Sequence, residues 1–327
     1  MLRYLSRRLA ASALVLLAAS FLVFVFVSFS GDPLFDLKMN PHTPDSTIRY
    51  REHLLHLDVP LIPRFWIWLK GVIFHFDFGT TLAGDAVRPQ LFGHMFITMR
   101  MVIAALIIAM IVSVSLGVYA ALRRNRTPDR TIQVVSFFFL ATPVFVTGLF
   151  FTYFVAVPLD KWAGKQILST SGASSVFAEG NFFQRIPDYL SHMTLPTLTL
   201  VLAIFSSWTI YQRSSVIETM SLDHVLFARS KGLSPRHVMR RHILRNALIP
   251  VVTVMALDFA GLLGGALITE SVYSWNGLGR WFIGGASRLD INITLGYLFL
   301  TAFFVISFNF LADVLYALLD PRIKSQR

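Results

Sequence analysis

Residues 228–250 read ARSKGLSPRHVMRRHILRNALIP, and residues 251–269 follow directly as VVTVMALDFAGLLGGALIT. The first stretch holds six Lys or Arg residues and two His residues, whereas the second holds a single charged side chain, Asp258. An apolar run of roughly 20 residues is long enough for a helix to cross the hydrocarbon core of a bilayer. This junction therefore predicts a membrane-spanning helix that begins directly after a strongly basic loop.

The rest of the chain has the same apolar character. Of its 327 residues, 55% are hydrophobic and 14% are charged, whereas soluble domains carry about 25% charged residues. Six stretches are long and apolar enough to span a bilayer: 9–29, 101–122, 131–159, 189–212, 247–269 and 291–312. Continuous runs of this length are unlike the alternating segments of about ten residues in a membrane β-barrel. The sequence therefore predicts an all-α integral membrane protein with six transmembrane helices.

The distribution of positive charge predicts the orientation of these helices. With the N-terminus inside, the inner segments hold 17 of the 29 Lys and Arg residues and four of the 18 acidic residues. The outer segments then hold 12 basic and 12 acidic residues. Because basic residues concentrate in cytoplasmic loops, we expect both termini in the cytoplasm and outer loops at 30–95, 158–187 and 271–290. The net charge of +11 is thereby explained by topology rather than by nucleic-acid binding.

Motifs for chemistry are missing from the sequence. It contains no GxxxxGK[ST] phosphate loop, no HExxH and no GxSxG, it has no Cys, and its nine His residues lack metal-ligand spacing. We therefore predict no catalytic, cofactor-binding or metal-binding residue and no enzyme activity. Three classes remain: a transporter subunit driven by other chains, an ion-coupled carrier and a structural membrane protein. A carrier usually needs ionisable groups at mid-membrane, and Asp258 is the only carboxylate placed there.

The longest inner segment, residues 213–250, is predicted to form two short helices. The first covers roughly residues 222–231 and ends at Gly232, which can adopt the positive φ of a sharp turn. The second begins with Ser234 as its N-cap and Pro235 at its first position. In the first helix one side is expected to combine apolar and charged residues that suit a groove on a partner protein; these are Leu222, Val225, Leu226 and Arg229.

Several motifs in this chain resemble one protein family. FARSKGL at 227–233, followed by RHILRNALIP at 241–250, resembles the EAA loop of ABC importer permeases, in the variant of the dipeptide, oligopeptide and nickel branch. The resemblance continues in GDP at 31–33, LHLDVPL at 55–61, ESVYSWNGLGRW at 270–281 and DPRIK at 320–324. It departs from the family pattern at Leu226 and Phe227, which replace the Glu and Ala of the general motif, and at Asn276, which replaces a frequent proline.

The resemblance implies the fold, the partners and the role of the loop. It implies a type I importer permease fold, with a first helix and outer loop at 1–95 and a five-helix core at 96–327. The loop at 213–247 would supply a cytoplasmic coupling helix that docks on a separate ATPase. The residues it assigns to this loop are Leu222, Asp223, Val225, Leu226, Ala228, Arg229, Lys231, Gly232, Ser234 and Pro235. The implied partners are a second homologous permease, two ATPase subunits that bind ATP and Mg²⁺, and an extracytoplasmic binding protein.

Two intramembrane features keep alternative interpretations. Asp258 either lines a polar path for substrate or makes a structural hydrogen bond to a neighbouring helix. The small residues Ala260, Gly261, Gly264 and Gly265 allow close helix approach, either within the chain or at a seam with the partner permease. The function expected from the whole sequence is an ATP-driven peptide importer subunit in a bacterial or archaeal inner membrane. The alternatives are an importer permease for nickel or another small solute and, in a different class, an ion-coupled secondary carrier.

Overall fold

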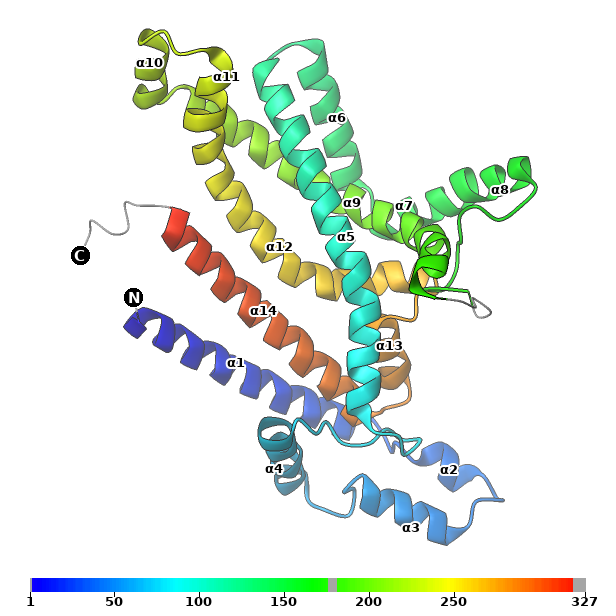
Figure 1. The fold of residues 1–327 in the computed structure, drawn as a ribbon. Coiled ribbons are helices and arrows are strands. Elements are labelled where there is room, and N and C mark those ends of the chain that lie inside the picture. The colour runs from blue at the N-terminus through cyan, green and yellow to red at the C-terminus, as the bar shows by residue number, and fades with distance from the viewer. Residues whose placement is uncertain (1, 176–180, 320–327) are drawn as a thin grey trace. The chain divides into compact units, whose positions relative to one another are not determined.

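The structure, a computed structural model, describes residues 2–175 and 181–319. Its regular elements are helices, and within these residues the one isolated β-bridge joins Thr80 to Ala86. The described chain falls into two compact units (Figure 1). Unit 1 comprises residues up to 99 together with 276–306, and unit 2 comprises residues 100–275 together with those from 307 onward.

The two units share two long helices and otherwise have their own elements. Unit 1 contains α1 (Leu2–Phe29), α2 (Phe35–Met39), α3 (Asp45–Leu54), α4 (Leu61–Lys70), the π-helical turn η1 (Gly71–His75), α13 (Leu278–Ser287) and the first parts of α5 (Val87–Leu122) and α14 (Ile291–Leu319). Unit 2 contains the remaining parts of α5 and α14, with α6 (Thr127–Ala141), α7 (Val144–Phe150), η2 (Phe151–Ala156), α8 (Val157–Ala163), α9 (Phe182–Met220), α10 (Asp223–Ser230), α11 (Pro235–Val238), η3 (Met239–Ile243) and α12 (Leu244–Val272).

Six helical segments in the described residues are long and apolar enough to cross a membrane. They are Ala10–Phe29, Val87–Leu122, Val144–Ala163, Phe183–Met220, Pro235–Phe259 and Ile291–Leu311. Each overlaps one of the six stretches predicted from the sequence, so the all-α, six-helix fold is confirmed. Large apolar side chains on these helices are exposed, among them Phe26, Ile111 and Phe154. Exposed apolar surface of this kind suits contact with lipid rather than water.

The predicted third span, residues 131–159, was wrong in its continuity. α6 ends at Ala141, and Thr142 adopts an extended ψ of 123° before Pro143 begins the next helical segment. Proline has no N–H to donate and drives the residue before it out of the helical region. The apolar segment that starts at Val144 is therefore a separate helix. In contrast, Pro196 and Pro250 lie inside α9 and α12 without ending them.

At one end of unit 1 the long helices meet the segment that joins α1 to α5. Arg64 of α4 donates a hydrogen bond of 2.8 Å to Ser28 near the end of α1. At the start of α14, Asn292 donates to the Thr80 carbonyl, and Asp290 accepts from the Leu82 N–H, each at 2.7 Å. The end of α1 and the start of α14 thus lie together. Within this unit α1 and α14 therefore run in opposite directions.

The aromatic segment 61–75 combines a buried and an exposed side. Its α4 residues Phe65, Trp68 and Leu69 are buried with Phe24 of α1, whereas Trp66 is 48% exposed. One side of α4 therefore packs against the rest of the chain, and the other side is exposed.

The centre of unit 2 is the long helix α9. It packs against α12, α6 and α7, and most of its apolar part is buried inside the protein. α5 also lies close to α9, since a Cβ built on Gly117 of α5 would be only 2.7 Å from the Cβ of Gln212 on α9. α9 therefore forms the core against which the other helices of this unit are positioned.

Candidate functional site

The basic loop folds into a compact turn of helices between α9 and α12, which we call the knuckle (residues 221–243). α9 ends at Met220, and Leu222, with an extended ψ of 144°, is the N-cap residue of α10; the C-cap residue of α10 is Lys231. Gly232 then adopts a φ of +74°, as expected for the turn. Ser234 precedes α11 as its N-cap residue and Pro235 opens it, although the Ser234 side chain makes no capping hydrogen bond.

A small apolar core attaches the knuckle to the long helices. Val225 and Ala228 of α10 are buried with Val238 and Ile243. Their neighbours in this core come from the ends of three long helices and are Ala121 of α5, Val216 of α9 and Ala247 of α12. A displacement of α10 would have to disturb this core, so the knuckle is mechanically connected to α9 and α12.

The exposed side of α10 differs from the one predicted. Val225 was expected to form an apolar patch with Leu222 and Leu226, but it is fully buried in the knuckle core. The exposed apolar side chains are instead Leu222 at 43%, Leu226 at 50% and Phe227 at 61%. The prediction was wrong because α10 has apolar residues on two sides, and helical periodicity does not show which of these sides packs against the rest of the protein. The face open to a partner is therefore Leu222, Leu226 and Phe227, which we call the α10 face.

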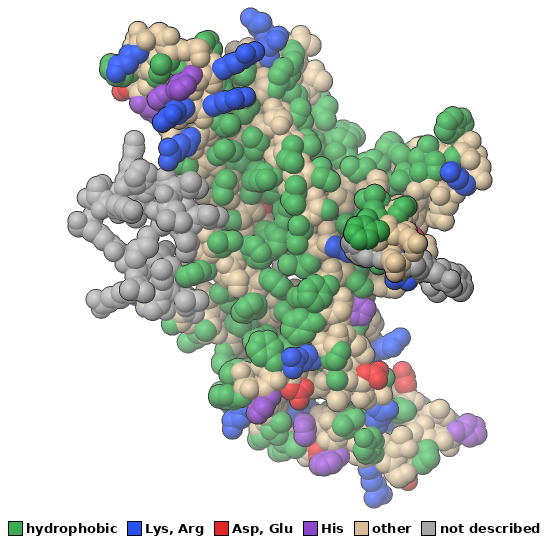
Figure 2. Space-filling view, in the orientation of Figure 1, with side chains coloured by type: hydrophobic (Ala, Val, Ile, Leu, Met, Phe, Trp, Pro, Cys, Tyr) green, Lys and Arg blue, Asp and Glu red, His purple; other side chains and the backbone are tan. Residues whose placement is uncertain are grey.

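Positive charge surrounds the α10 face. Lys231 Nζ lies 4.5 Å from the centre of the Phe227 ring, within cation–π range. Figure 2 shows basic side chains gathered at this end of unit 2, over α10, α11 and the turn between α5 and α6. The exposed ones are Arg123, Arg124, Arg126, Arg229, Lys231, Arg236, Arg240, Arg241 and Arg245. The site is thus a small apolar surface with a cationic rim, suited to a partner surface with an apolar groove and acidic edges.

A buried ion pair lies beside the knuckle. Arg213 of α9 donates from Nε to Asp129 Oδ1 at 2.5 Å and from Nη2 to Oδ2 at 2.8 Å. The Asn125 N–H and the Gln133 side chain also donate to this carboxylate. The Arg213 hydrogen bond is the main cause that lowers the pKa of Asp129 to about 2. The sequence contains no signal that would pair these two residues, which lie 84 positions apart.

Comparisons with known proteins identify the family of this chain. Residues 113–325 match the family described as the binding-protein-dependent transport system inner membrane component, and residues 1–125 match its N-terminal membrane component. The chain belongs to this family of ABC importer permeases.

Relatives of the permease cover its full length. The oligopeptide transport system permease protein OppB of Mycobacterium tuberculosis is 33% identical over 326 residues, which is 99% of both chains. The glutathione transport system permease protein GsiC of Salmonella typhimurium has the same identity and coverage. A solved structure, the crystal structure of an amino acid ABC transporter with histidines, covers 73% of this chain and 94% of its own, at 15% identity and a TM-score of 0.40. That structural similarity is too low to carry an argument.

Asp258 of the permease has a partner on a neighbouring helix. Trp208 Nε1 of α9 donates to Asp258 Oδ2 at 2.6 Å. The structural hydrogen bond that we considered for this residue is therefore present. Nearby lies an apolar hollow of about 240 Å³ with Trp208, Met255 and Phe259 among its lining residues. Asp258 is partly exposed, which leaves its carboxyl group accessible beside an otherwise apolar surface.

The predicted glycine seam is described only in part. Gly261 is exposed, and a Cβ built on it would meet nothing within 4 Å. The side-chain surroundings of Ala260, Gly264 and Gly265 lie outside what the structure describes. No helix of the described chain therefore packs closely on Gly261, and the face at this position is open.

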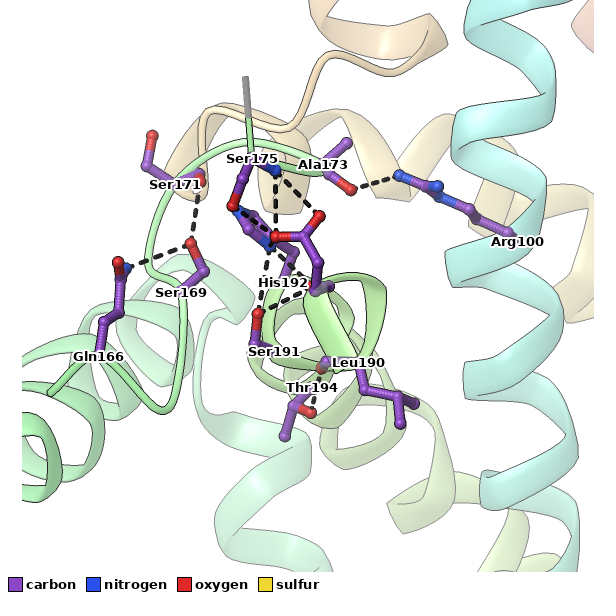
Figure 3. Close-up of polar contacts among 11 residues, drawn as sticks. Arg100, Gln166, Ser169, Ser171, Ala173, Ser175, Leu190, Ser191, His192 and Thr194 are labelled. Atoms are coloured by element: carbon purple, nitrogen blue, oxygen red, sulfur yellow. Dashed lines mark hydrogen bonds and ion pairs between the residues drawn. The ribbon is translucent and has the colours of Figure 1, made fainter. Parts of the chain in front are cut away.

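A polar cluster in unit 2, away from the knuckle, was not anticipated from the sequence. Figure 3 shows Arg100 of α5 donating to the Ala173 carbonyl. Ser175 donates from its N–H and its hydroxyl to the Asp188 carboxylate of α9. The guanidinium of Arg100 also lies 5.0 Å from the Tyr189 ring and 5.1 Å from the Trp275 ring. These contacts fasten residues 169–175 to α5 and α9. The cluster therefore has a structural explanation that needs no substrate.

Proposed function

We propose that the permease forms the membrane channel of an ATP-driven importer of peptides. Membership of this family supports a function in import. Two relatives, each matching 99% of the chain, are named for oligopeptide and glutathione transport, which favours peptides as the substrate class. Transport occurs by alternating access, in which the site for substrate opens to one side of the membrane at a time. ATP and Mg²⁺ are bound by separate ATPase subunits, since the sequence contains no phosphate-binding loop.

The α10 face is the proposed contact with an ATPase. Its apolar side chains are exposed in the chain, yet α10 itself is held by the buried Val225 and Ala228. A push on this face would therefore reach α9 and α12 through packed side chains, which transmit displacement because protein interiors are dense. Asp223, Arg229 and Lys231 would contribute charged contacts at the edge, and the turn at Gly232 would set the angle between α10 and α11.

The remaining partners follow from the same proposal. A second homologous permease completes the channel, and an extracytoplasmic binding protein delivers the peptide. Both termini and the knuckle lie in the cytoplasm of a bacterial or archaeal cell, which agrees with the basic residues around the knuckle. The open face at Gly261 is a proposed seam with the second permease, together with Ala260, Gly264 and Gly265. Asp258 is proposed to line the substrate path.

Reconstitution tests this function directly. The permease should be placed in vesicles with its second permease and a binding protein, with and without the ATPase subunits, and given labelled di- and tripeptides, free amino acids or Ni²⁺. We expect ATP-dependent uptake of peptides only when the ATPases are present. Uptake driven by a proton or sodium gradient without ATPases would favour an ion-coupled carrier. ATP-dependent uptake of Ni²⁺ alone would keep the importer and overturn the peptide assignment.

A further inference from the structure

Unit 1 contains a cavity to which the proposed function assigns no role. It has a volume of about 190 Å³ and lies between the end of α1, α4 and the start of α14. Its lining includes Phe24, Arg64, Ile67, Trp68, Thr80 and Asn292. One water occupies about 30 Å³, so the space can hold a group several times larger than a single water.

Buried hydrogen-bonding groups belong to this lining. Within the described residues, Arg64 Nε, Trp68 Nε1 and Thr80 Oγ1 are buried and have no hydrogen-bond partner. Two of these atoms can only donate, and a hydroxyl can donate as well. A buried donor without an acceptor costs roughly 1–3 kcal/mol, so three beside one cavity call for an acceptor there. A ligand with several acceptor oxygens would satisfy them together.

The cation in the lining points to an anionic ligand. In the described part of the chain, no carboxylate forms an ion pair with Arg64. Arg64 is held instead by the hydrogen bond from Nη2 to Ser28 and by the Phe24 ring, 5.1 Å from the guanidinium carbon. These contacts fix the guanidinium while leaving its Nε free to donate. Arginine in a fixed orientation is well suited to phosphate oxygens, which accept in pairs.

The depth of the cavity selects the source of the anion. Ser28 lies one residue before the end of α1, which is apolar from Ala10 to Phe29. The end of a spanning helix lies near the membrane–water boundary, where the lipid headgroups are. On α4, Ile62, Trp66 and Ile67 are exposed at 60%, 48% and 44%. An apolar surface beside the cavity at this depth suits an acyl chain.

The acidic residues of the lining limit the charge of the ligand. Asp290 is buried, and its carboxylate accepts hydrogen bonds from the N–H groups of Leu82 and Ile293. Burial raises the pKa of Asp290, which weakens the negative charge that this residue presents. Asp77 accepts from the Gly79 N–H and is exposed. Two carboxylates beside one arginine favour a singly charged phosphodiester over a doubly charged phosphate monoester.

We propose that this cavity binds the phosphodiester group of a membrane phospholipid. The phosphate oxygens accept hydrogen bonds from Arg64, Trp68 and Thr80, and an acyl chain covers the exposed apolar side of α4. The bound lipid thereby joins α4 to the end of α1. The lining residues of this site all belong to unit 1, whereas the α10 face belongs to unit 2.

Native mass spectrometry of the purified, delipidated full chain tests the proposal. Phosphatidylethanolamine is titrated onto the wild type and onto Arg64→Gln, Trp68→Phe and Thr80→Val, which remove one donor each and keep most of the side-chain volume. We expect the wild type to bind one phospholipid with the highest affinity of the set. Arg64→Gln should bind it roughly tenfold more weakly, as expected for the loss of a charge-assisted hydrogen bond. Lys70→Gln, an exposed cation on the same helix outside the lining, should bind like the wild type.

Competitors distinguish the possible ligands. Excess inorganic phosphate that displaces the lipid would show a site for free phosphate, and an acidic peptide that displaces it would show a peptide site; either result overturns the proposal. Equal lipid affinity in the wild type and in all three cavity variants would also overturn it, because the donors would then be satisfied by water. If Trp68→Phe fails to fold, Arg64→Gln and Thr80→Val decide the question.

Discussion

At the scale of single residues, Gly232 illustrates how a backbone conformation can carry a function. Its φ is +74°, and a Cβ at this position would meet no atom within 4 Å. A substitution therefore adds no clash with a neighbour, and its cost comes from the left-handed backbone, about 1 kcal/mol or more for a side chain with Cβ. The effect of a substitution should thus depend on how well the new residue tolerates this conformation.

We expect Gly232→Val to insert into the membrane normally and to lose ATPase association or the coupling of ATP hydrolysis to uptake. The β-branched side chain strains the turn, which changes the angle between α10 and α11 but not the spans. Gly232→Asn is the matched control, because Asn adopts the left-handed region more readily. Co-purification of the ATPase and peptide uptake measure the effect. Normal uptake by Gly232→Val would mean that the turn tolerates a change of angle.

The ion pair of Asp129 and Arg213 predicts a dependence of stability on pH. The pKa of Asp129 is about 2 in the folded chain against an ordinary 3.8. At pH values above the ordinary pKa, the pair therefore stabilises the folded state by about 2 kcal/mol, as expected for a shift of this size. This contribution is lost as the pH falls toward 2. Thermal unfolding in detergent between pH 5 and 2 should show the loss in the wild type and a smaller one in Asp129→Asn.

A double-mutant cycle separates the pair from its surroundings. Asp129→Asn leaves Arg213 without its carboxylate, and loss of one partner of a buried pair costs roughly 3–5 kcal/mol. We expect Arg213→Gln to have a similar effect and the double variant to cost less than the sum of the two. Strict additivity of the two changes would indicate that the pair contributes nothing beyond the individual side chains.

Asp258 can be tested by removing its charge while keeping its hydrogen bond. Asp258→Asn retains an oxygen that can accept from Trp208 Nε1, so we expect assembly and folding to survive. If the charge lines the substrate path, the change in uptake caused by this substitution should depend on the net charge of the peptide. Trp208→Phe is the companion variant, since it removes the hydrogen bond and keeps the charge. Uptake by Asp258→Asn equal to the wild type for acidic, neutral and basic peptides would leave only the structural role.

At the scale of elements, α10 has two sides with opposite expected sensitivities. Val225 lies in the knuckle core, whereas Leu226 is half exposed. Val225→Asp would bury a charge with no partner, at a cost of several kcal/mol, and should reduce the amount of folded permease. Leu226→Asp lies on the exposed side and should leave the fold intact. The neighbouring positions thus separate folding from docking.

We expect Leu226→Asp to weaken ATPase binding at least roughly tenfold, because it places a charge in an apolar contact. Leu226→Met keeps an apolar side chain of similar size and should bind normally. Binding of the purified ATPase to permease in nanodiscs measures both. Unchanged affinity for Leu226→Asp would show that the α10 face is not the contact and that the basic loop serves only as a topological anchor.

At the scale of the whole molecule, the orientation in the membrane is the property that the charge pattern predicts. The chain contains no Cys, so single cysteines can be introduced without a background. Ser174 and Ser230 are exposed and belong to the second outer loop and to α10. An impermeant thiol reagent added to intact cells should label Ser174→Cys, and should label Ser230→Cys only after the membrane is opened. Labelling of both from outside would reject the predicted topology.

Much of the molecule is determined by the sequence alone. Long apolar runs must become helices in a bilayer, because each backbone N–H and C=O needs a partner inside the segment. The runs at 9–29, 101–122, 189–212, 247–269 and 291–312 therefore predicted five spans closely. The knuckle followed from local chemistry as well, since glycine alone permits a positive φ at Gly232 at little cost and Pro235 favours the first turn of a helix.

Tertiary structure decided what depends on contacts between distant residues. Periodicity places Val225 and Leu226 on a short helix, but only packing against α5, α9 and α12 determines which one is buried. Arg213 lies 84 positions from Asp129, and Trp208 lies 50 positions from Asp258; no local pattern encodes such distances. The cavity beside Arg64 likewise forms only where α1, α4 and α14 meet. Local sequence determines elements through backbone hydrogen bonding, whereas sites arise from side chains that folding brings together.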